Sequence, residues 1–123
     1  MNYLTDRKRA AGLGAAGAGT HHHWQMMGTS IALVVLVPLF VVTFAIGLGG
    51  TYEDVIAFFA RPVPAIITGL TLVVGLIHLK AEADEAIVDY MHGTAQKLAL
   101  KFVAALSYTL IAAGLFALVK LAL

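Results

Sequence analysis

The chain has 123 residues, of which 60% are hydrophobic and 12% are charged, whereas soluble domains carry about 25% charged residues. A domain this small buries too little surface to hide so many apolar side chains from water, so the composition favours a membrane protein. The absence of cysteine excludes disulfides and thiolate metal sites, and scattered basic residues with a net charge of +1 predict no nucleic-acid binding.

The N-terminal 23 residues differ in composition from the rest of the chain. They begin with a basic cluster (Arg7, Lys8 and Arg9) and continue with a stretch rich in glycine and alanine. Such a composition is typical of a flexible arm. The consecutive histidines at 21–23 do not share a helix face, so they form a poor metal site. We therefore divide the chain into an arm, residues 1–23, and a membrane anchor domain, residues 24–123.

Three apolar stretches are long enough to cross a membrane, which takes about 20 residues in a helix. The predicted fold is therefore an all-α integral membrane domain. Pro38 lies in the first span and should kink it. The segment between the first two spans predicts a short interfacial helix, and Gly93 marks the expected stop of the middle helix. The predicted spans cover approximately residues 24–48, 63–84 and 98–122.

The distribution of lysine and arginine predicts how the chain is oriented. The arm carries three basic residues, and the region around the second loop carries Lys80, Lys97 and Lys101. The first loop has Arg61 and the C-terminus has Lys120. Because positive charge accumulates in cytoplasmic loops, we expect the N-terminus on the cytoplasmic or matrix side and the C-terminus on the opposite side.

His78 is the one ionisable side chain well inside a predicted span. Polar groups at that depth usually face a bundle interior, a ligand or a water path. A neutral imidazole is also a common axial ligand of haem iron. From position alone, a hydrogen bond to a neighbouring helix is the better interpretation, and haem ligation is the alternative.

A polar stripe continues from His78 toward the end of the same helix. Glu82, Glu85 and Asp89 follow at offsets of 4, 7 and 11 residues, and these offsets return to one helix face. Glu82 and Glu85 are most simply a solvated face. Asp89 and Tyr90 stand where the helix leaves the bilayer. A tyrosine hydroxyl there can donate to a quinone carbonyl, although an interfacial tyrosine is by itself more often part of the aromatic belt.

The chain contains no nucleotide loop, zinc pattern or nucleophile–base pair, so it is not expected to be catalytic alone. A haem ligand at His78 would need a second axial ligand from a partner, because no other intramembrane candidate is evident. A non-redox accessory or assembly subunit is the alternative function. A small transporter fits poorly, because the sequence has no inverted repeat.

The segment "HLKAEADEAIVDYMHG" resembles the middle-helix motif of the D-type hydrophobic membrane anchor subunits of succinate dehydrogenase, respiratory complex II. In that family a histidine precedes an Asp-Tyr pair by eleven residues, as His78 precedes Asp89 and Tyr90 here. "TYEDVIAFF", "TSIALVVLVPLF" and the histidine-tryptophan cluster before the first span are also similar to the family. The resemblance covers nearly the whole chain.

This resemblance implies a subunit of succinate:ubiquinone oxidoreductase in a bacterial or mitochondrial inner membrane. The chain would be half of a heterodimeric helical bundle that holds haem b with a cytochrome b-type anchor subunit. The two anchors would dock the iron–sulfur and flavoprotein subunits, which carry the clusters and FAD. His78 would be a haem b axial ligand, Tyr90 a hydrogen-bond donor to ubiquinone, and Asp89 its polar neighbour.

The first helix departs from the family pattern at one position. Many relatives have an arginine in the turn after the tryptophan, placed to meet a haem propionate, and Met27 stands there in this chain. The resemblance therefore predicts no propionate clamp from residue 27. His22, His23 or the partner subunit could supply that contact.

Overall fold

The computed structural model describes residue 3, residues 5–12 and residues 18–123. All regular secondary structure in these described residues is α-helical, which agrees with the predicted fold class. The parts of the predicted arm at residues 13–17 lie outside the described residues. The helices are α1 (Asp6–Ala11), α2 (Ala18–Gly47), α3 (Tyr52–Phe59), α4 (Pro62–Tyr90) and α5 (Gly93–Ala122).

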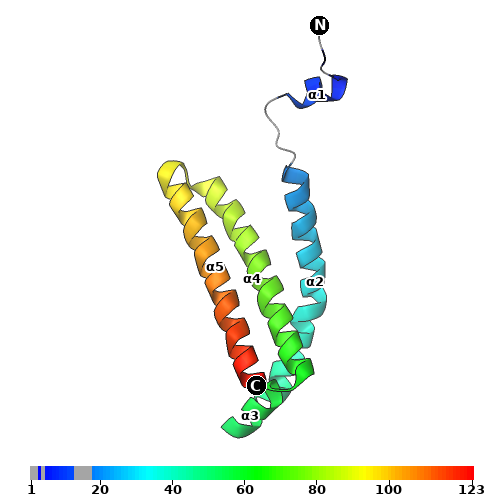
Figure 1. The fold of residues 1–123 in the computed structure, drawn as a ribbon, viewed down its shortest axis with the longest axis vertical. Helices are drawn as coiled ribbons and strands as arrows, with labels where there is room; N and C mark the ends of the chain where they lie inside the picture. Colours follow the sequence, from blue (N-terminus) through cyan, green and yellow to red (C-terminus); the bar gives the residue numbers. More distant parts are fainter. Residues whose placement is uncertain (1–2, 4, 13–17) are drawn as a thin grey trace.

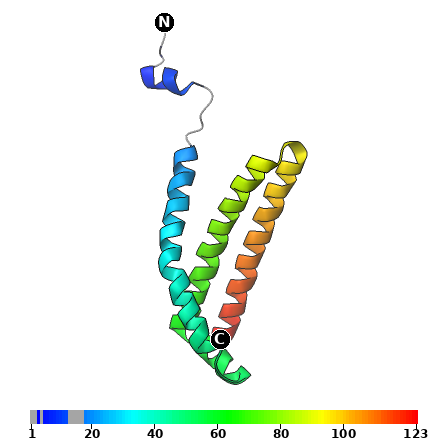
Figure 2. The same cartoon turned by 180° about the vertical axis from the view of Figure 1, so that it is seen from behind.

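Three of these helices, α2, α4 and α5, are long and apolar enough to cross a membrane. They run antiparallel in chain order, and α4 lies between the other two (Figures 1 and 2). Within the described part of the chain, α2 and α5 pack on α4 but not on each other. The middle helix therefore supplies both internal interfaces. The N-terminus of α2 and the α4–α5 turn share one end of the bundle, whereas α3 and the C-terminus share the other (Figure 1).

Helix α2 is longer than its predicted span, because it begins at Ala18 instead of near residue 24. Pro38 lies inside it, and α2 changes direction partway along its length (Figure 2). Proline has no backbone N–H and its ring crowds the preceding turn, which accounts for a bend in an otherwise regular helix. Helix α4 continues from the span through its charged segment without a break, as the sequence predicts.

Helix α3 closes the end of the bundle opposite the α4–α5 turn (Figure 1). A capping box starts it: the Thr51 hydroxyl accepts from the Asp54 N–H, and the Asp54 carboxylate accepts from the Thr51 N–H. The Thr51 hydrogen bonds hold the pKa of Asp54 below its usual value. At the other end of α3, Phe59 is buried and its ring lies 4.9 Å from that of Phe44 on α2.

The turn between α4 and α5 is short. Helix α4 ends at Tyr90 and α5 begins at Gly93, whose φ is +68°. The prediction that the middle helix stops at Gly93 therefore placed its end a few residues too late. A side chain at residue 93 would be strained in this conformation, and glycine avoids that strain.

Small residues set how closely the long helices approach. A Cβ at Gly69 of α4 would meet Leu118 of α5 at 3.5 Å, and a Cβ at Gly114 of α5 would collide with Leu72 of α4. In each helix, a glycine therefore packs against a leucine of the other helix. Such small-residue contacts let membrane helices gain van der Waals packing where no hydrophobic effect acts between them.

Candidate functional site

His78 lies on the face of α4 that packs against α2, and its side chain is 21% exposed. Its Nδ1 is 2.9 Å from the Thr29 hydroxyl oxygen. The same hydroxyl lies 3.0 Å from the backbone carbonyls of Gln25 and Met26, one turn earlier on α2. His78 therefore makes the hydrogen bond to a neighbouring helix that its depth in the span predicts.

The second ring nitrogen of His78, Nε2, has a looser contact. The Glu82 carboxylate, one turn along α4, lies 3.5 Å from it, which is beyond a good hydrogen-bond distance. The Glu82 side chain is 54% exposed. The Nε2 contact with Glu82 is therefore longer than the Nδ1 contact with Thr29, and the Glu82 carboxylate belongs to a largely exposed side chain.

A second pair joins α2 and α4 nearer the end that carries the α4–α5 turn. The His22 Nε2 lies 2.9 Å from the Glu85 carboxylate. His22 lies seven residues before Thr29 on α2, and Glu85 lies seven residues after His78 on α4. Because seven residues are about two helical turns, both pairs belong to one antiparallel register. Glu85 is therefore a partner of α2 and not only part of a solvated face.

An ion pair within α4 was not singled out from the sequence. The Lys80 ammonium lies 2.6 Å from Asp84 Oδ2, and both side chains are largely covered. A lysine and an aspartate four residues apart lie on the same face of a helix, and this spacing could have predicted the pair. The other carboxylate oxygen of Asp84, Oδ1, is buried without a hydrogen-bond partner among the described residues. A buried acceptor without a partner is uncommon in folded proteins, because its desolvation is not compensated.

Asp89 and Tyr90 occupy the last turn of α4. Asp89 lines a cavity of about 330 Å³ together with His22, Asp84, Glu85 and Val88. Tyr90 does not line this cavity, and it is 88% exposed. The two sequence-predicted sites are separate, because His78 and Tyr90 are twelve positions apart, which corresponds to about 18 Å along α4.

The remaining sequence candidates are not gathered into a site. His21, His23 and Met27 are exposed, and the described residues contain no cluster of three or more His, Cys, Asp or Glu side chains suited to a metal ion. A haem needs only one histidine from each side, so such a cluster is not a requirement for the haem hypothesis.

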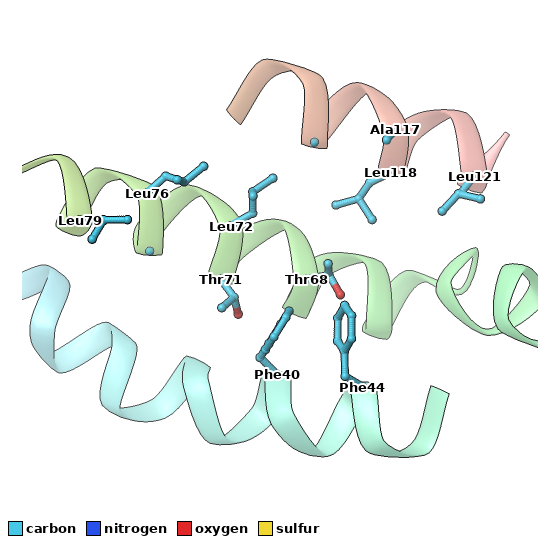
Figure 3. A pocket seen from close by; sticks show the side chains of 12 residues that line it. Phe40, Phe44, Thr68, Thr71, Leu72, Leu76, Leu79, Ala117, Leu118 and Leu121 are labelled. Atoms are coloured by element: carbon cyan, nitrogen blue, oxygen red, sulfur yellow. The ribbon is translucent and has the colours of Figure 1, made fainter. Parts of the chain in front are cut away.

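A cavity of about 480 Å³ elsewhere in the bundle is lined by none of the sequence-predicted site residues. It lies between α2, α4 and α5. Phe40 and Phe44 of α2 point toward α4 beside Thr71 and Thr68, and Leu72 and Leu118 lie between α4 and α5 (Figure 3). Its polar members include Thr71, whose hydroxyl donates to its own helix backbone. Thr68 also lines the cavity, and its hydroxyl is buried without a hydrogen-bond partner among the described residues. The lining is therefore suited mainly to hydrocarbon, with the Thr68 hydroxyl as one group able to bind a polar atom.

Comparison with known proteins gives one family and one full-length relative. The family model of the succinate dehydrogenase/fumarate reductase transmembrane subunit matches residues 1–117. The chain is 42% identical over 123 residues to the succinate dehydrogenase hydrophobic membrane anchor subunit of Paracoccus denitrificans. That alignment covers 100% of this chain and 95% of the relative. No solved structure gives a significant match.

Proposed function

Because the chain belongs to the succinate dehydrogenase/fumarate reductase transmembrane subunit family, we propose that it is a membrane anchor subunit of succinate dehydrogenase that supplies a haem b ligand and part of a ubiquinone site. The three apolar helices make it a multi-pass membrane protein. The observation that carries the haem part of the proposal is the environment of His78, which differs at its two ring nitrogens.

The residues around His78 fit a haem ligand. An axial histidine uses one nitrogen for the metal and usually donates the other N–H to a fixed acceptor. His78 has such a contact at Nδ1 with Thr29, and its Nε2 lies outside good hydrogen-bond range of Glu82. Haem b, when bound, can accept and release one electron. A cytochrome b-type anchor subunit would supply the opposite axial ligand.

The quinone part of the proposal rests on the end of α4. Tyr90 presents an exposed side chain beside Asp89, which borders a cavity lined largely by acidic residues. A tyrosine hydroxyl can donate to a quinone carbonyl, and a nearby carboxylate can hold or pass a proton. Tyr90 would thus be the donor and Asp89 its polar neighbour.

The same end of the bundle is the proposed docking face for the soluble subunits. It includes the α4–α5 turn and the start of α2, and it carries most of the basic side chains (Figure 1). Positive charge at this end corresponds to the cytoplasmic or matrix side. The iron–sulfur and flavoprotein subunits, which would hold the clusters and FAD, are therefore expected to bind there.

The decisive test replaces His78 by leucine in the assembled complex. Leucine keeps the helix apolar and removes a partly buried polar group, so assembly should continue. We expect the haem to be lost or to become high-spin, measured as a reduced-minus-oxidised spectrum and as haem per flavin. Thr71→Val, which removes from the same helix a hydroxyl that donates to its own backbone, should leave both quantities unchanged. A wild-type spectrum from His78→Leu would instead favour the non-redox accessory subunit.

A further inference from the structure

We propose that Thr29 is a positioning residue for His78: its hydroxyl fixes which imidazole nitrogen carries the proton and so tunes the strength of the ligand at Nε2. This inference deepens the proposed function and rests on it, since it concerns the same histidine. Thr29 lies on α2, whereas His78 lies on α4, and Thr29 would act on the ligand only through the imidazole.

The hydrogen bond between the two residues has a direction. A threonine hydroxyl has one proton to donate and two lone pairs that accept. The proton of Thr29 is directed to the α2 backbone, because its oxygen lies 3.0 Å from the carbonyls of both Gln25 and Met26. The lone pairs then face His78 Nδ1 at 2.9 Å. In a neutral imidazole, this arrangement favours the tautomer that donates from Nδ1 and carries no proton on Nε2.

Thr29 is held firmly enough to impose this choice. Its β-branched side chain is restricted at χ1, and the backbone bond selects one orientation of the hydroxyl. One helical turn along, Leu33 of α2 packs over Gly75 of α4, where a Cβ would meet Leu33 Cδ2 at 3.9 Å. Two turns in the other direction, His22 pairs with Glu85. Contacts on both sides therefore fix the register of the Thr29–His78 bond.

The consequence concerns the electron-donating ability of Nε2. A histidine whose Nδ1–H donates to an acceptor is a more basic ligand, and losing such a partner typically lowers metal affinity by about 10- to 100-fold. A stronger donor stabilises ferric over ferrous haem. The Thr29 hydroxyl should therefore hold the haem midpoint potential lower, and slow haem loss, relative to a chain that lacks the hydroxyl.

The experiment compares four variants of the intact complex. Thr29→Val removes the hydroxyl at nearly constant shape. Thr43→Val is the matched control, because Thr43 lies on the same helix, is buried and donates to the Leu39 carbonyl of its own helix. Thr29→Ser and Thr29→Ala differ by the hydroxyl alone, so they give the same comparison if valine disturbs packing.

Two quantities are measured: the haem midpoint potential by redox titration, and the rate of haem transfer to apomyoglobin. Thr29→Val and Thr29→Ala should raise the potential and speed haem loss on the order of 10-fold, while Thr29→Ser and Thr43→Val stay near wild type. Equal values for Thr29→Val and Thr43→Val, or for the alanine and serine variants, would overturn the role of Thr29. Retention of a native spectrum by His78→Leu would instead overturn the proposed function itself.

Discussion

Polar side chains along α4 divide into those satisfied within the chain and those that present an unused group. The Thr29 hydroxyl is hydrogen-bonded to Nδ1 of His78, and Asp84 Oδ2 accepts from the Lys80 ammonium. In contrast, Asp84 Oδ1 is buried without a partner among the described residues, and Tyr90 is exposed. The groups that are hydrogen-bonded within the chain help to hold α4 in place. A donor or acceptor without a partner in the chain is where a new hydrogen bond to a ligand would add most binding energy.

Tyr90→Phe tests the quinone assignment at one atom. The change removes a hydroxyl from a side chain that is already exposed, so folding should be unaffected. Losing a neutral hydrogen bond of about 0.5–1.5 kcal/mol should lower quinone reduction several-fold, while succinate oxidation with a soluble dye acceptor stays near normal. Tyr52→Phe is the matched control, because Tyr52 is an exposed tyrosine at the opposite end of the bundle. Equal quinone kinetics for the two variants would assign Tyr90 to the aromatic belt.

Between helices, the α4–α5 contact depends on the exchange of leucines and glycines. A Cβ at Gly114 would collide with the end of the Leu72 side chain, so Gly114→Val should displace Leu72 and disturb the packing between the two helices. Overpacking of this kind typically costs about 1–3 kcal/mol, and we expect a lower midpoint in thermal unfolding of the purified complex. Ala113→Val adds two carbon atoms, against three for Gly114→Val, at an exposed neighbouring position and should change the midpoint little. A comparable loss in both variants would argue against a specific contact at Gly114.

The sequence predicted the long helices well, because local signals determine each of them. Continuous apolar stretches indicate α2, α4 and α5, and the offsets from His78 to Glu82, Glu85 and Asp89 place these residues on one face. Two boundaries were less predictable. The extension of α2 back to Ala18 passes through glycine and alanine, which give weak hydrophobic signals, and α4 ends at Tyr90, before the expected glycine.

The partners of the candidate site were harder to predict, because they depend on the register between helices. Thr29 and His22 stand many residues before His78 and Glu85, and nothing local in the sequence aligns the two pairs. The register of α2 along α4 is set by many side-chain contacts, including that of Leu33 with Gly75. The Lys80–Asp84 pair, in contrast, lies within one helix, so its spacing of four residues could have predicted it from the sequence.

Across the whole molecule, the proposed haem and quinone positions follow one helix toward the end richer in basic residues. His78 lies within the α2–α4 interface, and Tyr90 stands about 18 Å further along α4. The apolar cavity beside Phe40 and Phe44 is lined on α4 from Thr68 to Leu79, so it begins level with His78 and extends toward the end that carries α3. The chemistry that we propose therefore occupies the half of the protein nearer the α4–α5 turn.

The orientation of the chain in the membrane can be tested directly. Of its eight lysines and arginines, six precede α2 or lie between residues 80 and 101, whereas Arg61 and Lys120 are near the other end. This asymmetry predicts a cytoplasmic or matrix N-terminus and a C-terminus on the outer side. Because the chain has no cysteine, Ala122→Cys introduces a single thiol, which an impermeant reagent should label from the outer side of intact membranes. Thr94→Cys, in the first turn of α5, should be labelled only after the membranes are disrupted. The reverse pattern of labelling would invert the topology and place Tyr90 on the outer side.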